Sequence, residues 1–354
     1  MIVFLTTVSW SVKQTTNGET YNCVDFYEQP AFDHPLLKDN KFNFQPSSSY
    51  SVDSSGSSNK KQSDIWLNGK GCPIGTVPIR KTTRDDLSRA ESAAETVHTN
   101  TNDNLHPQRY IDDNPNVHVA VLRTSEEKKY YGAGMITSVY NFAVSSQQYS
   151  SSRIKLQNGP DSIVVGWTIN PGLYGDNATR HFIYTSTKDS HCYNTLCPGF
   201  ILMSPDTPFD SVLQVSEREK NIRGQKFFVR KDAASGDWVL QIGLDNTTVG
   251  TWPQKIFSKL NDSATYVDWG GEAYSASSED LPPMGSGFPP MRSSVLDGYG
   301  RQVTLVDENQ QVDYNPPECV TYTSDNKRYK IFDEGNVGGE IQRLIVFGGS
   351  SGPA

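Results

Sequence analysis

From His118 onward the chain is a succession of short segments rich in Val, Ile, Tyr, Phe and Thr, and this pattern constrains the fold most. These residue types favour strands, and turn residues such as Asn-Gly and Ser-Gly-Asp separate many of the segments. No long helical pattern comes between them, which disfavours crossover-linked parallel strands. The sequence therefore predicts an antiparallel β-sandwich or barrel. The segments are 118–124, 130–144, 162–169, 181–187, 199–204, 225–231, 237–243, 302–308 and 343–349.

One stretch before this region has helical spacing. Thr83 followed by Asp86 has the character of a capping box, and apolar residues recur after it at helical intervals. Two polar stretches, 47–64 and 95–116, lack periodicity and predict a loop and an exposed linker. We therefore expect an N-terminal segment with one helix at 19–97, a linker at 98–117 and an all-β domain at 118–354. The apolar residues of the predicted helix are Leu87, Ala90, Ala93, Ala94 and Val97.

Charge and hydropathy exclude some classes of partner. The net charge is −8, and no basic cluster exceeds two lysines, so we expect neither a nucleic-acid partner nor an anionic membrane surface. Apolar runs fall far short of the roughly 20 residues that span a bilayer. Residues 1–18 begin with a short apolar run that we interpret as the remnant of a signal peptide, although a buried first strand is the alternative. Secretion, to the extracellular space or the vacuole, is expected if the full gene product carries a signal peptide.

The cysteines favour an oxidising compartment. Cys192 and Cys197 are separated by four residues, and no second Cys or His pair follows at zinc spacing. We therefore expect a small-loop disulfide, no metal site and no cofactor. Three glycosylation sequons, at Asn177, Asn246 and Asn261, are consistent with secretion.

The strongest candidate for chemistry is a carboxylate in the stretch Asp268-Trp269-Gly270-Gly271-Glu272. The two glycines allow the backbone to turn or to approach another group closely. A glutamate beside aromatic side chains is desolvated, which raises its pKa and suits it to acid–base chemistry. The alternative is a bulged strand end with a solvated Glu272. A Ser-His-Asp triad is compatible with the sequence, but no motif indicates one.

Several co-linear segments resemble the neprosin family. NCVDFYEQPAFDHPLL (22–37) and CPIGTVPIRKTTRDDLSRA (72–90) resemble the neprosin activation peptide. The other segments resemble the neprosin catalytic domain. They are VGWTINPGLYGDNATRHFIYTSTKDSHCYNTLCPGF (165–200), GDWVLQIG (236–243), TWPQKIFSKL (251–260), WGGE (269–272), MGSGFPP (284–290) and VFGG (346–349). The resemblance implies a secreted plant glutamic endopeptidase that cleaves after proline under acidic conditions. It also implies a β-sandwich kept latent by its own N-terminal peptide.

The family mechanism uses two glutamates, one as base and one as acid. The second, in Trp-Gly-Gly-Glu, maps to Glu272. The first stands two residues before Gly166-Trp167, where this chain has Val164. A valine has no proton and no lone pair, so the resemblance implies impaired or absent catalysis. Asp161 points to the opposite face of a strand from Val164 and is a poor substitute.

Three readings remain open. The first is a neprosin-like homologue that has lost catalysis but keeps a cleft for a peptide ligand. The second is an active acid prolyl endopeptidase that pairs Glu272 with another carboxylate such as Asp268 and takes peptides or proteins with proline as substrates. The third, weaker reading is a sandwich protein that binds or cleaves sugar.

The resemblance also bears on the cysteines. It supports the bond between Cys192 and Cys197 and implies a bridge between Cys23 and Cys72 within the N-terminal segment. The family pairs the cysteine at the position of Cys319 with a C-terminal cysteine that this sequence lacks, so we expect a free thiol there.

Overall fold

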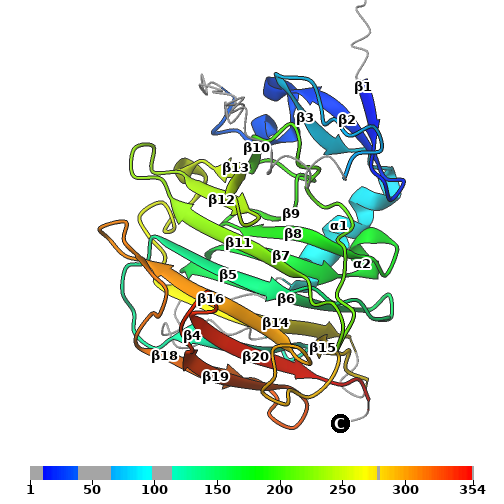
Figure 1. The fold of residues 1–354 in the computed structure, drawn as a ribbon. Helices are drawn as coiled ribbons and strands as arrows, with labels where there is room; N and C mark the ends of the chain where they lie inside the picture. The colour runs from blue at the N-terminus through cyan, green and yellow to red at the C-terminus, as the bar shows by residue number, and fades with distance from the viewer. Residues whose placement is uncertain (1–10, 39–64, 98–113, 277–279, 353–354) are drawn as a thin grey trace, which may run out of the picture.

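Two large antiparallel sheets packed face to face form the body of the protein in the computed structural model (Figure 1). The model describes residues 11–38, 65–97, 114–276 and 280–352. The predicted all-β sandwich is confirmed. Residues 98–113, most of the predicted linker, lie outside the described residues, and the first strand of the sandwich begins at Val117.

The first sheet has seven strands in the order β18-β4-β14-β6-β7-β8-β9. Its bounds are β4 (Val117–Thr124), β6 (Gln148–Asn158), β7 (Asp161–Ile169), β8 (Thr179–Ser186), β9 (His191–Tyr193), β14 (Tyr266–Ser275) and β18 (Cys319–Thr323). A short helix, α2 (Pro171–Tyr174), follows β7; Asn170 caps its start, and Gly175 ends it in the left-handed conformation.

The second sheet has ten strands, with the main order β10-β13-β12-β11-β5-β16-β20-β15, while β17 pairs with β16 and β19 with β20. Its bounds are β5 (Gly132–Ser138), β10 (Ile201–Leu202), β11 (Gly224–Lys231), β12 (Trp238–Ile242), β13 (Thr247–Trp252), β15 (Met284–Gly285), β16 (Gly298–Val306), β17 (Val312–Asp313), β19 (Lys330–Asn336) and β20 (Arg343–Gly349). A 3-10 turn, η4 (Gln254–Ile256), follows β13.

The core lies between these two sheets. Strand side chains alternate between faces, so every second residue of β7 points inward: Ile163, Val165, Trp167 and Ile169 all belong to the main apolar cluster. The remaining β7 residues, such as Val164, lie on the opposite side, which we call the outer face of the seven-stranded sheet.

The described residues before position 98, which we call the N-terminal segment, form a small three-stranded sheet and one helix. The sheet consists of β1 (Ser11–Gln14), β2 (Thr20–Asp25) and β3 (Thr76–Arg80), and two 3-10 turns follow β2, at Phe26–Glu28 and Pro30–Asp33. This small sheet was not predicted. β1 lies inside the stretch interpreted as a signal remnant, and residues 1–10 of that stretch lie outside the described residues.

Helix α1 (Arg84–Val97) is the predicted helix. Its capping box is present, because the Thr83 amide donates to Asp86 Oδ2 at 2.7 Å and the Asp86 amide donates to Thr83 Oγ1 at 3.2 Å. The predicted apolar stripe is wrong at its start: Leu87 is exposed, while Ala90 and Ala94 are buried. The helix therefore presents a narrow face of small residues to its neighbours.

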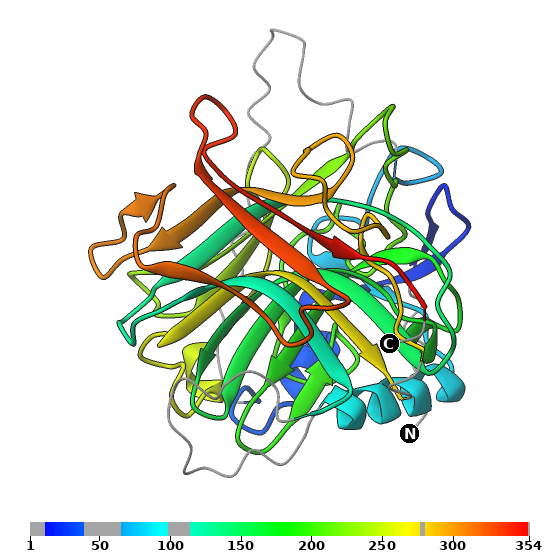
Figure 2. The same ribbon diagram turned by 90° about the horizontal axis from the view of Figure 1, so that it is seen from below.

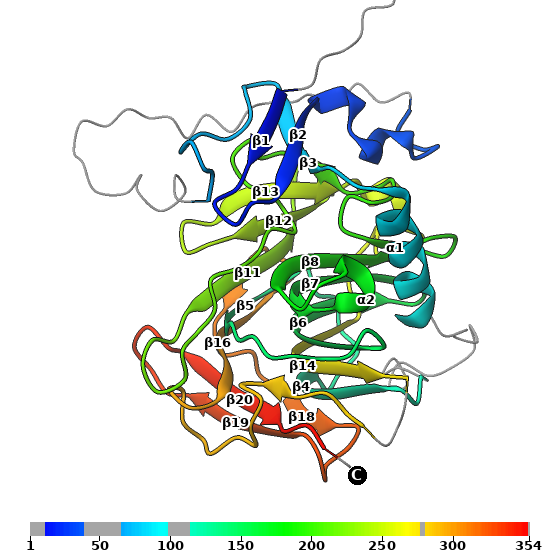
Figure 3. The ribbon, with the colours of Figure 1, turned by 90° about the vertical axis from the view of Figure 1, so that its right-hand side faces the viewer.

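The N-terminal segment lies at one end of the sandwich, beside β12 and β13 (Figure 3), and hydrogen bonds anchor it there. Gln29 Nε2 donates to the Leu202 carbonyl at 3.1 Å, and Gln29 Oε1 accepts from the Leu202 amide at 2.7 Å. Trp66 Nε1 donates to the Asp206 carbonyl at 2.8 Å. In the described part of the chain, we find no helix with the length and apolar character needed to cross a bilayer.

Candidate active site

Val164 and Glu272 lie on the same outer face, on strands separated by β6. Strand register places Glu272 beside Ser151 and, one strand further, Thr168. Val164 is level with Lys155 and, one strand further, Asp268. Val164 and Glu272, which occupy the positions of the two family glutamates, therefore lie diagonally across β6. They are offset by four residues along the strand direction.

A buried arginine occupies the space between them. Arg153 on β6 is in register with Gly166 on one side and Gly270 on the other, and neither neighbour has a side chain. Its guanidinium is ion-paired with Asp268 through Nη1 and with Glu272 through Nε, the latter at 2.7 Å. The Arg153 side chain is 1 % exposed, so this is a buried ion triad.

Both carboxylates of the triad have a further tyrosine partner. Tyr149 donates its hydroxyl hydrogen to Glu272 Oε1 at 2.9 Å, and Tyr266 donates to Asp268 Oδ2 at 2.8 Å. Each oxygen of Glu272 is thus engaged, Oε1 by Tyr149 and Oε2 by Arg153. The Glu272 side chain is 12 % exposed and that of Asp268 only 3 %, so Glu272 is the carboxylate within reach of solvent.

Helix α1 covers the other half of the outer face. Figure 3 shows α1 beside β7, β8 and α2, and Val164 is buried in an apolar cluster that joins this helix to β7, β8, β9 and α2. The cluster consists of aliphatic and aromatic side chains. It therefore offers no group suited to act as a base in place of the glutamate that Val164 replaces. The members of the cluster are Ala90, Ala94, Val164, Leu173, Tyr174, Phe182, Tyr184 and Tyr193.

A hollow remains beside the helix. A cavity of about 330 Å³ lies between α1 residues including Arg89 and Ala93 and sandwich residues including Tyr149 and Tyr274. The two tyrosine rings are stacked, with centroids 5.5 Å apart. Because Tyr149 also donates to Glu272, this cavity adjoins the candidate site.

The charge of Glu272 affects the pKa of Tyr193, a member of the apolar cluster beneath α1. Burial raises the pKa of Tyr193 well above its usual value, and the charges of Tyr184 and Glu272 add to the rise. Tyr193 packs with Val164 under α1. Glu272 therefore influences the apolar cluster that contains Val164.

Two aromatic residues of the site motifs point elsewhere. Trp167 and Trp269 are fully buried between the sheets, because their positions have the opposite strand parity from Val164 and Glu272. The prediction that Glu272 projects beside Trp269 is therefore wrong. Asp161 also lies away from the site, where its Oδ2 accepts from the amides of Lys259 and Leu260 at 2.5 and 3.0 Å.

Other predicted positions are placed as follows. Disulfides join Cys23 to Cys72 and Cys192 to Cys197. Cys319 is a free thiol, and burial raises its pKa to about 11. Among the described residues we find no group of three or more His, Cys, Asp or Glu side chains arranged to hold a metal. The sequon asparagines, Asn177, Asn246 and Asn261, are exposed.

Sequence reasoning missed Tyr149 and Arg153 because it did not identify β6 as a strand. The serines at positions 150–152 carry no apolar signal, although they are buried within the strand. A usable signal was present: Arg-Ile-Lys-Leu at 153–156 alternates between polar and apolar residues.

Solved structures with a similar arrangement of sheets include two peptidases and a lectin. Scytalido-glutamic peptidase with a peptide-based transition-state analogue is 7 % identical, covering 67 % of this chain and 98 % of its own, with a TM-score of 0.37. SCP-B, an eqolisin-family peptidase bound to the tripeptide Ala-Ile-His, is 7 % identical with the same coverage and a TM-score of 0.33. Chicken galectin 2 is 8 % identical, covering 45 % and 97 %, with a TM-score of 0.25. Likenesses this weak carry no inference about function.

Two family models match the chain directly. The neprosin activation peptide matches residues 12–128, which include the N-terminal segment, α1 and β4. The neprosin model matches residues 146–350, which carry Arg153, Val164, Asp268 and Glu272 and make up more than half of the chain. The protein belongs to the neprosin family.

Proposed function

We propose that this protein is a neprosin homologue whose peptidase activity is impaired or absent, and that it keeps its cleft as a site for a peptide ligand. The observation that carries the proposal is the burial of Val164 in an apolar cluster beneath α1, with Glu272 as the remaining family glutamate. Hydrolysis by two glutamates needs one group to take a proton from water and a second to donate one to the scissile bond. Glu272 alone supplies one of these roles.

The Asp268–Glu272 pair is a weaker candidate for catalysis. Arg153 is bound to both, and ion pairs of this kind require both carboxyls to be charged. A glutamic-peptidase mechanism requires one carboxyl of the pair to be protonated. Asp268 is also the more deeply buried of the two and bonds to Tyr266 as well, which keeps it from a bound peptide.

In this proposal the N-terminal segment is the chain's own inhibitor, because α1 lies across the face on which a peptide would have to bind. Secretion and glycosylation at the exposed asparagines are part of the same proposal, as is a plant source, which rests on the resemblance alone. We also propose specificity for proline, which rests on the family resemblance.

Restoration of the missing carboxylate is expected to create activity. Val164→Glu, in a chain nicked within residues 98–113 so that α1 can leave, should cleave a proline-containing peptide at acidic pH faster than the unmodified chain. A gain of about 10²-fold or more is expected, since a positioned acid or base contributes about 10²–10⁴-fold.

The matched control is the double variant Val164→Glu with Glu272→Gln, which should lose the gain. Cleavage would be followed by mass spectrometry of the peptide. A gain that survives in the double variant would show that the new glutamate does not work with Glu272 and would contradict the assignment of both positions.

A further inference from the structure

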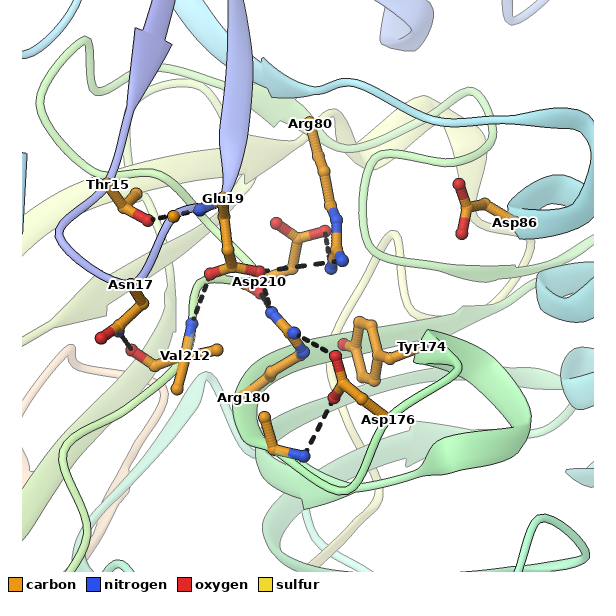
Figure 4. A network of polar contacts seen from close by, with 12 residues as sticks. Thr15, Asn17, Glu19, Arg80, Asp86, Tyr174, Asp176, Arg180, Asp210 and Val212 are labelled. Carbon is orange, nitrogen blue, oxygen red and sulfur yellow. Dashed lines mark hydrogen bonds and ion pairs between the residues drawn. The ribbon is translucent and has the colours of Figure 1, made fainter.

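The N-terminal segment is fastened to the sandwich by a cluster of charged side chains separate from the candidate site (Figure 4). Glu19, at the start of β2, is ion-paired with Arg180 of β8 and accepts from the Val212 amide at 2.9 Å. Arg80 of β3 lies 3.7 Å from Glu19 and 3.9 Å from Asp210 of the sandwich. The N-terminal segment and the sandwich thus contribute side chains of opposite charge to one buried contact.

Asp210 is the least compensated member of this cluster. It is 3 % exposed, and its carboxylate accepts from a neutral donor, the Tyr21 hydroxyl, at 3.0 Å. Arg180 donates to the Asp210 backbone carbonyl at 3.3 Å rather than to its carboxylate, and is also ion-paired with Asp176 at 2.7 Å. The cluster therefore holds one more carboxylate than guanidinium.

We infer that Asp210 takes up a proton when the N-terminal segment docks, so that acidification tightens the hold of the sandwich on the segment. A buried carboxylate whose cation lies as far away as 3.9 Å is stabilised by protonation, and the protonated group can still bond to Tyr21. Three of the four groups around it, Glu19, Tyr21 and Arg80, leave with the segment.

The titration of Asp210 supports this direction. Burial raises its pKa to about 7, although the charge of Arg80 opposes the rise and that of Glu19 adds to it. With the segment gone, the group returns toward its ordinary value of 3.8. A pKa that is higher in the docked state gives a contribution that is complete below the ordinary pKa and is lost as the pH rises through about 7.

Other titratable groups at the contact also affect how the docking of the segment depends on pH. Burial raises the pKa of Asp206, beside Gly71 and Trp66 of the segment, so Asp206 acts in the same sense. Burial, with the charge of Lys255, lowers the pKa of His34 in the segment, so His34 opposes docking in acid. His181, behind Asp210 against Phe209, has its pKa lowered by burial to about 4 and is neutral above that pH.

The experiment uses the full chain, cut at a protease site placed within residues 98–113. Neither disulfide joins the two parts, because Cys23–Cys72 lies within the segment and Cys192–Cys197 within the sandwich. The dissociation constant of a fluorescently labelled segment is then measured between about pH 8 and about pH 5. This readout does not require catalysis, so it is independent of the proposed function.

The dissociation constant of the unmodified chain should fall by about tenfold or more over this range, since one proton linked to binding gives up to tenfold per pH unit. Asp210→Asn should bind tightly throughout and lose most of the dependence. Glu19→Gln, which changes the segment and not the sandwich, should weaken the dependence, and His34→Gln should steepen it.

A dissociation constant that stays constant or rises on acidification of the unmodified chain overturns the inference. The same holds if Asp210→Asn keeps the full dependence. Should Asp210→Asn fail to fold, Glu19→Gln decides, because an unchanged pH dependence in that variant contradicts the charge surplus.

Discussion

Replacement of Arg153 by methionine is expected to lower the free energy of unfolding by about 3–5 kcal/mol, the usual effect of removing one partner of a buried ion pair. Arg153 is bound to both Asp268 and Glu272, so its loss removes one buried guanidinium from two carboxylates at once. Urea unfolding at neutral pH, followed by tryptophan fluorescence, measures the change.

The matched control is Arg292→Met. Arg292 makes two hydrogen bonds to Glu334 but is 57 % exposed, so its removal should cost much less than the removal of Arg153. In the triple variant, Arg153→Met with Asp268→Asn and Glu272→Gln, part of the lost stability should return. Equal losses in the two arginine variants would contradict the description of a buried triad.

Ala94→Asp is expected to release α1 from the outer face. Ala94 is 6 % exposed and packs with Val164 and Tyr193, so an aspartate there would place a charge among apolar side chains. Burial of an unpaired charge costs several kcal/mol, which exceeds what one short helix gains from docking through alanines. Amide hydrogen exchange in residues 84–97 should become faster by about tenfold or more.

Ser92→Asp is the control for this variant, since Ser92 is exposed at the rim of the cavity beside the same helix. It introduces the same charge two residues away and should leave the exchange rates unchanged. Faster exchange in both variants would mean that the charge destabilises the helix itself, and unchanged exchange in Ala94→Asp would show that α1 does not depend on this contact.

The sandwich, seen from below in Figure 2, was predictable from the sequence where strands alternate cleanly or run as apolar stretches, as in β7 and β20. β6 was not, because its serines at 150–152 are buried by neighbouring strands rather than by their own hydrophobicity. The N-terminal sheet was not predicted, because β2 pairs with β3 across about 50 residues of intervening chain.

The candidate site was half predictable. Parity along a strand places Val164 with Gly166, and Asp268 with Glu272, on one face, and the structure has them there. The same rule, applied to Trp269, would have assigned it to the core. Arg153 could not be placed as the partner of two carboxylates without the strand order, because β6 lies between β7 and β14 although it precedes both in the sequence.

Dependence of cleavage on Glu272 tests the central claim most directly. The unmodified chain and Glu272→Gln, both cut within residues 98–113 and freed of the N-terminal segment at the pH of weakest docking, are compared on one proline-containing peptide at acidic pH. If catalysis is lost with the first glutamate, the two proteins cleave at the same background rate, and the peptide binds to both. Cleavage by the unmodified chain that disappears in Glu272→Gln would contradict the account and establish an active enzyme with a different partner for Glu272.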